Sequence, residues 1–467
     1  MAAVLILVGA GAVRIAAGLD GLWLDEIWSL GLASRASSPW DILTGLHHEN
    51  NHYLNTLWIW LLGLQPNWIL YRLPAMIAGV AATAFAGSIG WRRSPLAALL
   101  AMLLAATSYL LIHYSSEARG YSYAVCSALA CVDFQERMFR GARWRSVLGT
   151  LLSAVAGILS QPVFLAFYGA LLLWSAGKLW FGGRSMRPLR KKWCLAHGPA
   201  LLFFVWLYEV DLWQVINGGG PIYPLGEVVA QTLSLAIGGP DTGAGIAAGA
   251  ACASLLYLAA LAVLWRRDRD WCILSMLTVI VMPTVLMVAT GRREVYPRYF
   301  LIPVAFLQLT MALAVAAFDA RGRLGRILTG ILLGCLVLGN GLHTFRLLNL
   351  GRGGYFPLMA DLVELTPGSE INVGSDHDFR NETVLAFYSQ YLPATKRLVY
   401  FPRDQWPAAG PDWLLLHFLD REVEPQLELG DVVGHHYRLE RFYPYAGLSG
   451  WNWALYRNDS DRGKTPH

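Results

Sequence analysis

Long apolar runs dominate the first three quarters of this 467-residue sequence. Each run is roughly 16 to 22 residues long, which is enough for a helix to cross the hydrocarbon core of a bilayer. Hydrophobic residues make up 55% of the chain and charged residues only 15%, and a soluble domain of this length would carry more charge. We therefore predict an α-helical polytopic membrane protein.

The runs predict about eleven membrane crossings. They cover residues 3–19, 70–90, 96–112, 120–136, 146–161, 162–181, 194–209, 244–265, 271–289, 299–318 and 325–343. One further apolar segment, 54–64, would span only about 17 Å as a helix, which is too short for a crossing. We predict that it is a juxtamembrane or re-entrant helix of the first outer loop, where it helps to form a chamber.

The basic residues orient the crossings, because Lys and Arg collect in cytoplasmic loops. The basic clusters lie at 92–93, 137–145, 184–192, 266–269 and 321–326. All of them fall on one side of the predicted helices, so we expect a multi-pass protein of the inner (plasma) membrane with a cytoplasmic amino terminus and a periplasmic carboxyl terminus. The net charge of +5 then reflects membrane topology and not nucleic-acid binding.

The composition changes after His343, and the remaining residues are polar enough to fold in water. Strands are predicted at 370–373, 398–401, 413–417 and around 451–456, and helices at 361–365 and 382–391. We therefore predict two domains: a transmembrane catalytic domain at 1–345 and a small periplasmic α/β domain at 346–467.

An acidic pair, Asp25 and Glu26, stands at the outer mouth of the first apolar run. A carboxylate near lipid is costly unless it faces a polar cavity, so the pair is a candidate for a working group in a site. The alternative is an interfacial carboxylate that simply reaches into water. The polar loop that follows carries His48, Glu49 and His52 just before Tyr53.

The residues His48-Glu49-Asn50-Asn51-His52 match the zinc-protease pattern in letters. In that pattern two histidines one helical turn apart hold zinc while the glutamate activates water, which requires a helix through the motif. Two successive asparagines favour a turn or a cap, and the helix is expected to begin after them. The six cysteines show no zinc-ligand spacing either, so no metal site is assigned.

Two further outer loops carry charge. Glu117 and Arg119 lie between two short crossings, where they either point into the same chamber as Asp25 or form an interfacial ion pair. A later loop holds Arg292, Arg293 and Arg298 beside Tyr299, against the rule that disfavours arginine outside. Guanidinium groups bind phosphate well, and contact with anionic lipid headgroups is the alternative.

Four motifs resemble the GT-C glycosyltransferases, in particular the bacterial branch akin to protein O-mannosyltransferases and to the lipid A aminoarabinose and galacturonic acid transferases. They are Leu22-Trp23-Leu24-Asp25-Glu26, the His-Glu-Asn-Asn-His-Tyr-Leu loop at 48–54, Tyr71-Arg72-Leu73-Pro74 and Tyr114-Ser115-Ser116-Glu117-Ala118-Arg119-Gly120-Tyr121. The resemblance covers roughly residues 1–345, and its most specific parts precede residue 125.

The resemblance implies roles for several residues. Asp25 would be the catalytic base with Glu26 as its support, Glu117 would be the acidic residue of the second outer loop, and Arg298 with Tyr299 would hold the carrier phosphate. It also implies a polyprenyl-phosphate sugar donor and inversion at the anomeric carbon. Many relatives have His-Pro-Pro or Lys-Pro-Pro where this chain has Asn50-Asn51-His52, so the roles of His48 and His52 in acceptor or metal binding stay open.

The sequence hypothesis is therefore a membrane glycosyltransferase that moves a sugar from a polyprenyl-phosphate carrier to a glycolipid, lipid A, polysaccharide or protein acceptor. The donor phosphate would be bound by Arg119, Arg292, Arg293, Arg298 and Tyr299. The acceptor side would be formed by His48, Glu49, His52 and Tyr53. No cofactor is predicted beyond a divalent metal that some relatives bind. A membrane zinc protease and a lipid or sugar transporter without covalent chemistry are the alternatives, although no repeated halves with broken helices are visible in the sequence.

Overall fold

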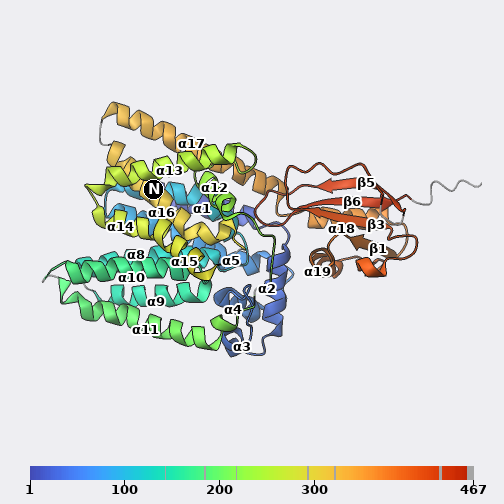
Figure 1. Ribbon diagram of the computed structural model, residues 1–467, viewed down its shortest axis with the longest axis horizontal. Coiled ribbons are helices and arrows are strands. Elements are labelled where there is room, and N and C mark those ends of the chain that lie inside the picture. The colour runs from blue at the N-terminus through green and yellow to red at the C-terminus, as the bar shows by residue number, and fades with distance from the viewer. Residues whose placement is uncertain are drawn as a thin grey trace, which may run out of the picture. The chain divides into compact units, whose positions relative to one another are not determined.

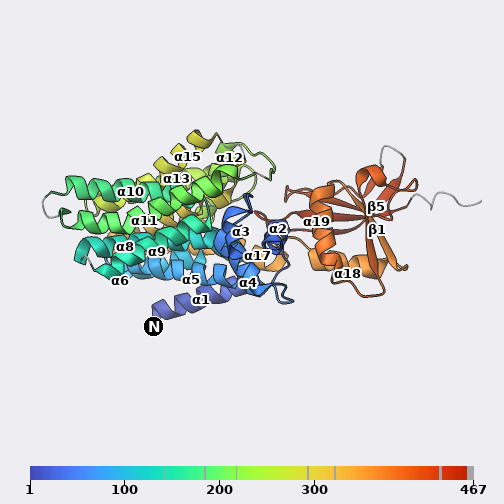
Figure 2. The same ribbon diagram turned by 90° about the horizontal axis from the view of Figure 1, so that it is seen from below.

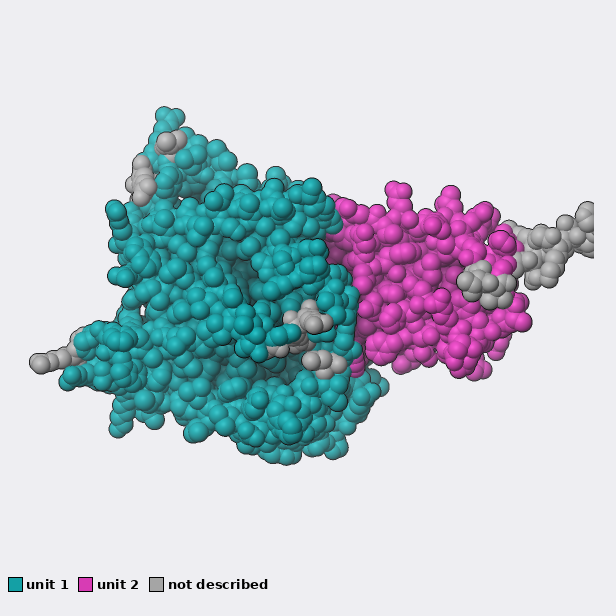
Figure 3. All heavy atoms as spheres, in the orientation of Figure 1, with its two compact units in different colours: residues 1–18, 29–344 teal, residues 19–28, 345–467 magenta. Residues whose placement is uncertain are grey.

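The computed structural model describes residues 1–141, 143–183, 186–216, 218–291, 294–319, 322–430 and 434–459. The chain divides into two compact units, which Figure 3 colours separately. Unit 1 comprises Met1–Gly18 and Ser29–Thr344, and unit 2 comprises Leu19–Trp28 and Phe345–His467.

Unit 1 is a bundle of helices, most of which run roughly parallel to one another (Figure 1). Its helices are α1 (Ala2–Ala17), α3 (Pro39–Thr44), α4 (Tyr53–Leu62), α5 (Ile69–Trp91), α6 (Pro95–Thr107), α7 (Tyr109–Ser115), α8 (Tyr121–Gly141), α9 (Trp144–Ser160), α10 (Phe164–Phe181), α11 (Leu189–Val210), α12 (Leu225–Ala236), α13 (Gly245–Trp265), α14 (Arg269–Met276), α15 (Met282–Thr290) and α16 (Leu301–Asp319). Two helices cross the unit boundary, α2 (Leu24–Arg35) and α17 (Arg323–Leu350). The short α3 and α4 lie at one end of the bundle, which we call the α4 end (Figures 1 and 2).

Each of the eleven predicted crossings coincides with helical structure. Among the described residues, seven helices are long and apolar enough to cross a membrane, and the bent pair α6 and α7 makes an eighth. The remaining three predicted crossings correspond to α1, α8 and α9, of which α1 and α9 are shorter apolar helices. The sequence did not predict α12, because its twelve residues are too few for a crossing.

The helix α16 forms the centre of the bundle. Of its apolar window 78% is buried inside the protein, against 22% for α11 and 28% for α13. An apolar helix with this degree of burial packs against protein on nearly all sides, whereas α11 and α13 leave most of their apolar surface to lipid. Residues at the two ends of α16 are therefore fixed by the packing of the whole bundle.

Ion pairs fasten the end of the bundle opposite α4, which we call the Arg92 end. Arg92 donates to Asp133 at 2.5 Å and to Glu136 at 2.6 Å. Arg93 bonds the same Glu136 at 2.8 Å and also Asp268 at 2.8 Å. These contacts join the loop after α5, the last turns of α8 and the loop before α14, so the basic clusters at 92–93 and 266–269 share one end of the bundle, as the sequence predicted.

Helix α4 begins at Tyr53 and ends at Leu62, which gives a length of about 15 Å. It is too short to span a bilayer, in agreement with the predicted juxtamembrane helix. His52 occupies its N-cap position in an extended conformation. The chain therefore enters this helix only after the asparagine pair.

Unit 2 is built around a six-stranded sheet in the order β2-β1-β3-β6-β5-β4. The strands are β1 (Glu370–Ser375), β2 (Arg397–Phe401), β3 (Trp413–Phe418), β4 (Glu428–Gly430), β5 (His436–Tyr443) and β6 (Asn452–Asn458). β1 runs parallel to β2 and β3, and the remaining neighbours are antiparallel. The helices α18 (Tyr355–Leu365) and α19 (Asp378–Ser389) cover one face of the sheet (Figures 1 and 2).

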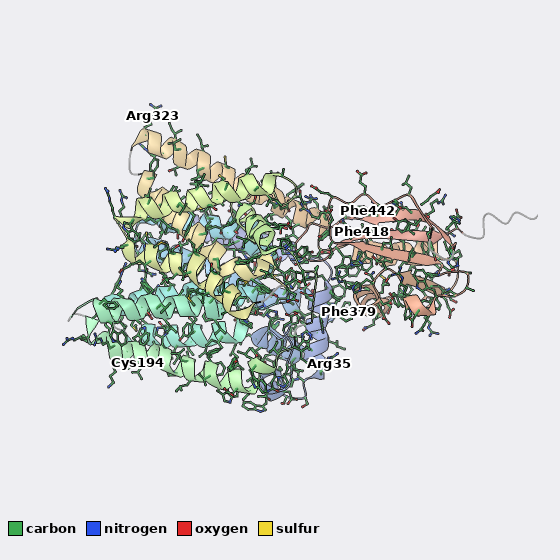
Figure 4. All side chains as sticks on the ribbon, in the orientation of Figure 1. Arg35, Cys194, Arg323, Phe379, Phe418 and Phe442 are labelled. Carbon is green, nitrogen blue, oxygen red and sulfur yellow. The ribbon has the colours of Figure 1, made fainter. Side chains whose placement is uncertain are left out.

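The opposite face of the sheet carries its own apolar cluster. Leu414, Tyr437 and Tyr456 form its buried centre, and Phe418 and Phe442 pack against it (Figure 4). The predicted strands correspond to β1, β2, β3 and β6, whereas β4 and β5 were missed. The segment Leu19–Trp28 also belongs to unit 2, which the sequence-based boundary at 345/346 did not anticipate.

Candidate functional site

A polar hinge between α6 and α7 aims the loop at 116–120. The two helices are bent by 59° at Ser108. The bend frees the Tyr109 amide inside the bundle, and polar side chains of neighbouring helices bond to this amide and to the Ser108 hydroxyl. Asn340 Oδ1 accepts the Tyr109 amide at 2.8 Å, and Gln308 Nε2 donates to Ser108 Oγ at 3.0 Å. Contacts from α16 and α17 thus fix the direction of α7 and of the loop that follows it.

Glu117 lies in this loop and is fully buried. Its Oε1 is 3.2 Å from Nε2 of His113, one helical turn earlier, and neither side chain has exposed surface. The His113 ring contacts the rings of Tyr109 and Tyr114 edge-on. A buried carboxylate is costly unless polar partners surround it, so the alternative of a solvent-exposed interfacial ion pair does not describe Glu117.

Arg119, two residues further along, joins this loop to the first loop of the chain. Its Nη2 donates to Asn50 Oδ1 at 2.7 Å and lies 3.3 Å from His52 Nε2. The guanidinium carbon is 5.0 Å from the centre of the Tyr121 ring, and only 3% of the residue is exposed. An arginine with this many neighbours is held in one position and is not a solvated surface group.

His52 is held as a neutral imidazole. Its Nδ1 is 3.2 Å from the carbonyl oxygen of Ser160, to which it donates, so Nε2 accepts from Arg119. Burial, followed by the charge of Arg119, lowers the pKa of His52 well below 6.5. The backbone at Gly120 passes close by, because a Cβ there would lie 2.1 Å from the Ser160 oxygen and 2.8 Å from His52 Nδ1. Only glycine fits at this position.

Arg298 belongs to the same neighbourhood. Its guanidinium carbon lies 4.3 Å from the centre of the Tyr296 ring and 5.7 Å from that of Tyr299. The charges of Arg298 and Glu117 both act on His52, and both act on Tyr114. The structure therefore brings Arg298 together with the loop at 116–120. Arg292 and Arg293, the other two predicted phosphate-binding arginines, lie outside the described residues.

The first loop is anchored to the segment after α11. Nδ1 of His47 is 2.6 Å from Oδ1 of Asp211, and the Tyr53 hydroxyl donates to the other oxygen of the same carboxylate. The Glu49 amide donates to the Ile216 carbonyl at 3.2 Å, and His48 forms a parallel bridge with the same residue. The hydrogen bond from Tyr53 to Asp211 therefore helps to hold this loop in place.

This geometry is wrong for the zinc-protease alternative. His48 lies in a β-bridge, residues 49–50 form a turn and His52 precedes α4, so the helix that the pattern requires is not formed. The ring nitrogens of the two histidines also have other uses. His48 Nδ1 accepts the Asn50 amide at 3.0 Å, and His52 Nδ1 faces the Ser160 carbonyl.

Asp25 and Glu26 open helix α2 and belong to unit 2. Glu26 is fully buried, and its Oε2 accepts the Trp23 amide at 3.3 Å, one turn before it. Asp25 is half-buried. The pair thus divides into a fixed buried member and a more accessible one.

Two buried charged residues of the bundle, Asp211 and Arg14, were not predicted from the sequence. Asp211 anchors His47 across 164 residues, and no local pattern connects the two. Arg14 did carry a signal, because it is a charged residue inside an apolar run. It is 1% exposed, donates to the carbonyls of Ala10 and Ala105, and lines a cavity of about 20 Å³ together with Tyr114 and Gln308.

The described arrangement is a bundle of apolar helices with a small α/β domain, as the sequence predicted. No family model matches the chain, and no curated protein matches it. The chain is similar to the crystal structure of ArnT from Cupriavidus metallidurans bound to undecaprenyl phosphate, with 13% identity, a TM-score of 0.51 and 97% of each chain covered. The apo structure of the same protein gives 12% identity, a TM-score of 0.53 and the same coverage. At this level of identity the match shows a common fold that extends over nearly the whole chain.

Proposed function

We propose that this protein is a membrane glycosyltransferase that moves a sugar from a polyprenyl-phosphate carrier to an acceptor hydroxyl at the α4 end of the bundle. The observation that carries the proposal is the cluster of buried Glu117, Arg119 and His52 with half-buried Arg298, in a fold shared with a protein crystallised with undecaprenyl phosphate. Buried titratable groups of mixed type, assembled from distant loops, are characteristic of functional sites.

The chemistry assigns a simple role to each group. The carboxylate of Asp25 accepts the proton of the acceptor hydroxyl while its oxygen attacks the anomeric carbon of the sugar. The bond from that carbon to the carrier phosphate breaks, and the polyprenyl phosphate leaves as an ionised group that needs no general acid. Attack opposite the leaving group inverts the configuration at the anomeric carbon.

Cationic residues stabilise the departing phosphate. Arg298 and Arg119 are the described candidates, with Tyr299 beside Arg298 and with Arg292 and Arg293 assigned from the sequence alone. Guanidinium groups bind phosphate oxygens through charge-assisted hydrogen bonds, which strengthen as charge develops on the leaving group. We assign Glu117 to keeping these arginines in place between turnovers, because its charge acts on the same neighbours as that of Arg298.

The acceptor side is assigned to the first loop. His48, Glu49 and His52 lie on a segment that is anchored through Tyr53 and Asp211, so its backbone is held in place before any acceptor arrives. Preorganisation of this kind reduces the entropic cost of positioning a hydroxyl for attack. We further propose that the α4 end of the bundle faces the periplasm, on the evidence of the basic residues at the opposite end.

The test measures release of undecaprenyl phosphate from undecaprenyl-phosphate-linked hexoses and pentoses by the purified protein, in the presence of lipid extract as acceptor. Wild type should release the carrier, and Asp25→Asn should lower the rate at least about 100-fold because the base is lost. Asp41→Asn is the matched control, since Asp41 is a partly exposed aspartate that takes part in the capping box of α3. Absence of any release by wild type would refute the proposal, and transport of the donor without a covalent product would favour a transporter.

A further inference from the structure

The segment Leu19–Trp28, which carries the acidic pair, packs as part of the carboxyl-terminal domain and not of the helical bundle. Residues of this segment contact residues more than 300 positions later in the chain. The Tyr388 hydroxyl donates to the Leu22 carbonyl at 2.9 Å in a buried position, and the Arg352 amide donates to Asp20 Oδ2 at 2.6 Å. The first bond holds the backbone at Leu22 and the second holds the side chain of Asp20, and both residues precede the acidic pair.

A second contact holds the segment after the acidic pair. The Trp28 ring meets the ring of Phe379, in the first turn of α19, edge-on with centroids 5.5 Å apart; Phe379 is labelled in Figure 4. The acidic pair is therefore bracketed by Leu22 on one side and by Trp28 on the other. Each bracket is supplied by the same helix, α19, which carries both Phe379 and Tyr388.

The contacts leave little room for movement. A Cβ at Gly21 would lie 2.5 Å from the Tyr388 hydroxyl and 3.2 Å from Cδ2 of Tyr355. Gly351, at a φ of +63°, is similarly close to the Asp20 carboxylate, because a Cβ there would be 2.3 Å from Oδ2. Close approach of this kind from both sides is possible only with glycine.

The charges of the segment converge on one buried ring. Tyr355 is 1% exposed and stacks on Tyr388 with an interplanar angle of 14° and centroids 5.4 Å apart. The charges of Asp20, Glu26, Arg352 and Asp25 all act on the Tyr355 hydroxyl. The stacked tyrosines thus lie close to the residues that precede α2, at Gly21 and Leu22.

We infer that the carboxyl-terminal domain positions Asp25 for catalysis, with Tyr388 and Tyr355 as its positioning residues. This inference rests on the proposed role of Asp25 as the base. The domain is then part of the catalytic apparatus and not a separable cap over it. Because small displacements of a reacting group lower rates steeply, loosening the segment lowers kcat while leaving donor binding by the bundle intact.

The test combines Tyr388→Phe with Tyr391→Phe as its matched control. The first removes one hydroxyl and its bond to Leu22, whereas Tyr391 is a half-exposed tyrosine just past the end of the same helix. For Tyr388→Phe we expect faster amide hydrogen exchange across 19–28, a fall in kcat of about tenfold, and a KM for the donor and a Kd for undecaprenyl phosphate within twofold of wild type. Tyr391→Phe should match wild type in all four measurements.

The possible outcomes are distinct. Unchanged exchange across 19–28, or faster exchange with unchanged kcat, would overturn the inference while Asp25→Asn still reports on the proposed function. If wild type releases no carrier at all, the proposed function fails, and the exchange measurement alone then decides whether the segment is held by the domain.

A second pair of variants guards against simple misfolding. Gly21→Ala should lower kcat and speed exchange across 19–28, because its Cβ collides with the Tyr388 hydroxyl. In the Tyr388→Phe background the nearest obstacle becomes the Tyr355 ring at 3.2 Å, so the same substitution should cost less there. Equal effects in both backgrounds would contradict direct contact between the two positions.

Discussion

The two ends of the helical bundle both hold arginines close to carboxylates, but they are built from different materials. At the Arg92 end, two arginines share Glu136 and reach Asp133 and Asp268, and the side chains of the pairs range from fully buried to 24% exposed. At the α4 end, Glu117 and Arg119 are 3% exposed or less and lie against histidine, tyrosine and asparagine side chains. The first arrangement balances opposite charges and fastens helix ends.

The second arrangement is more costly than fastening requires. Its charged side chains are more deeply buried, and burial of charge is costly, so such an arrangement is expected where the chemistry of the protein needs it. The comparison teaches that the presence of arginine and carboxylate does not by itself mark a site. The degree of burial and the mixture of titratable partners do.

Replacing one carboxylate at each end should produce the largest difference in activity between the two ends. Glu117→Gln should lower carrier release at least about 100-fold, because the charge that acts on His52 and Tyr114 alongside Arg298 is lost. Glu136→Gln should keep activity within about twofold of wild type but lower stability by about 2 kcal/mol, since it weakens two charge-assisted hydrogen-bond systems. Turnover and thermal unfolding in detergent micelles measure both effects.

The proposed difference between the two ends is contradicted if Glu117→Gln and Glu136→Gln have the same effect on activity. Equal loss of activity in Glu136→Gln would mean that the Arg92 end takes part in turnover or in a motion that turnover needs. Full activity in Glu117→Gln would reduce the buried cluster to a structural feature.

A smaller effect, on stability, is expected from replacing the glycines at the two ends of α8. Gly120 precedes α8 and Gly141 is its last residue. Gly120→Ala should destabilise the protein by about 1–3 kcal/mol, because the new Cβ collides with the Ser160 carbonyl and with His52. Nothing lies within 4 Å of a Cβ at Gly141, so Gly141→Ala should change stability by less than about 0.5 kcal/mol. Thermal midpoints of the two variants in the same detergent provide the measurement, and similar midpoints would show that the loop at 116–120 yields easily.

The same two ends show what a sequence reveals and what it hides. Membrane crossings are predictable because length and apolarity are properties of one continuous segment, and each predicted run coincides with helical structure. Glu117 and Arg119 were identified because charge is unusual between two apolar runs. The three-residue β4 and the charged β5 were not predicted, because neither strand has a continuous apolar pattern.

Contacts between distant segments were out of reach for a different reason. The bond from Tyr388 to Leu22 joins positions 366 residues apart, and that from His47 to Asp211 joins positions 164 apart. Such pairs leave no periodicity or spacing in a single sequence. The difference in burial between Asp25 and Glu26 could not be predicted either, because their segment groups with residues more than 300 positions later in the chain.

The smallest predicted effect concerns pH and follows from His52. Its pKa is lowered in the folded protein by burial and by Arg119, whereas in the unfolded chain it is near 6.5. Below pH 6.5 His52 therefore binds a proton in the unfolded chain but not in the folded protein. The free energy of unfolding then decreases as the pH falls, by up to about 1.4 kcal/mol per pH unit. Above that range both states are neutral at this residue and the contribution is constant.

His52→Gln separates this contribution from those of the other histidines. Glutamine retains a donor for the Ser160 carbonyl and an acceptor for Arg119, but it does not titrate. The variant should therefore lose stability less steeply than wild type between pH 6.5 and 5.5, whereas His436→Gln, at an exposed position of β5, should follow the wild-type curve. Thermal unfolding across this range decides the matter. If the stability of His52→Gln and of wild type depended on pH in the same way, His52 would take up a proton in the folded state without penalty. The α4 end would then be more accessible to water than its burial indicates.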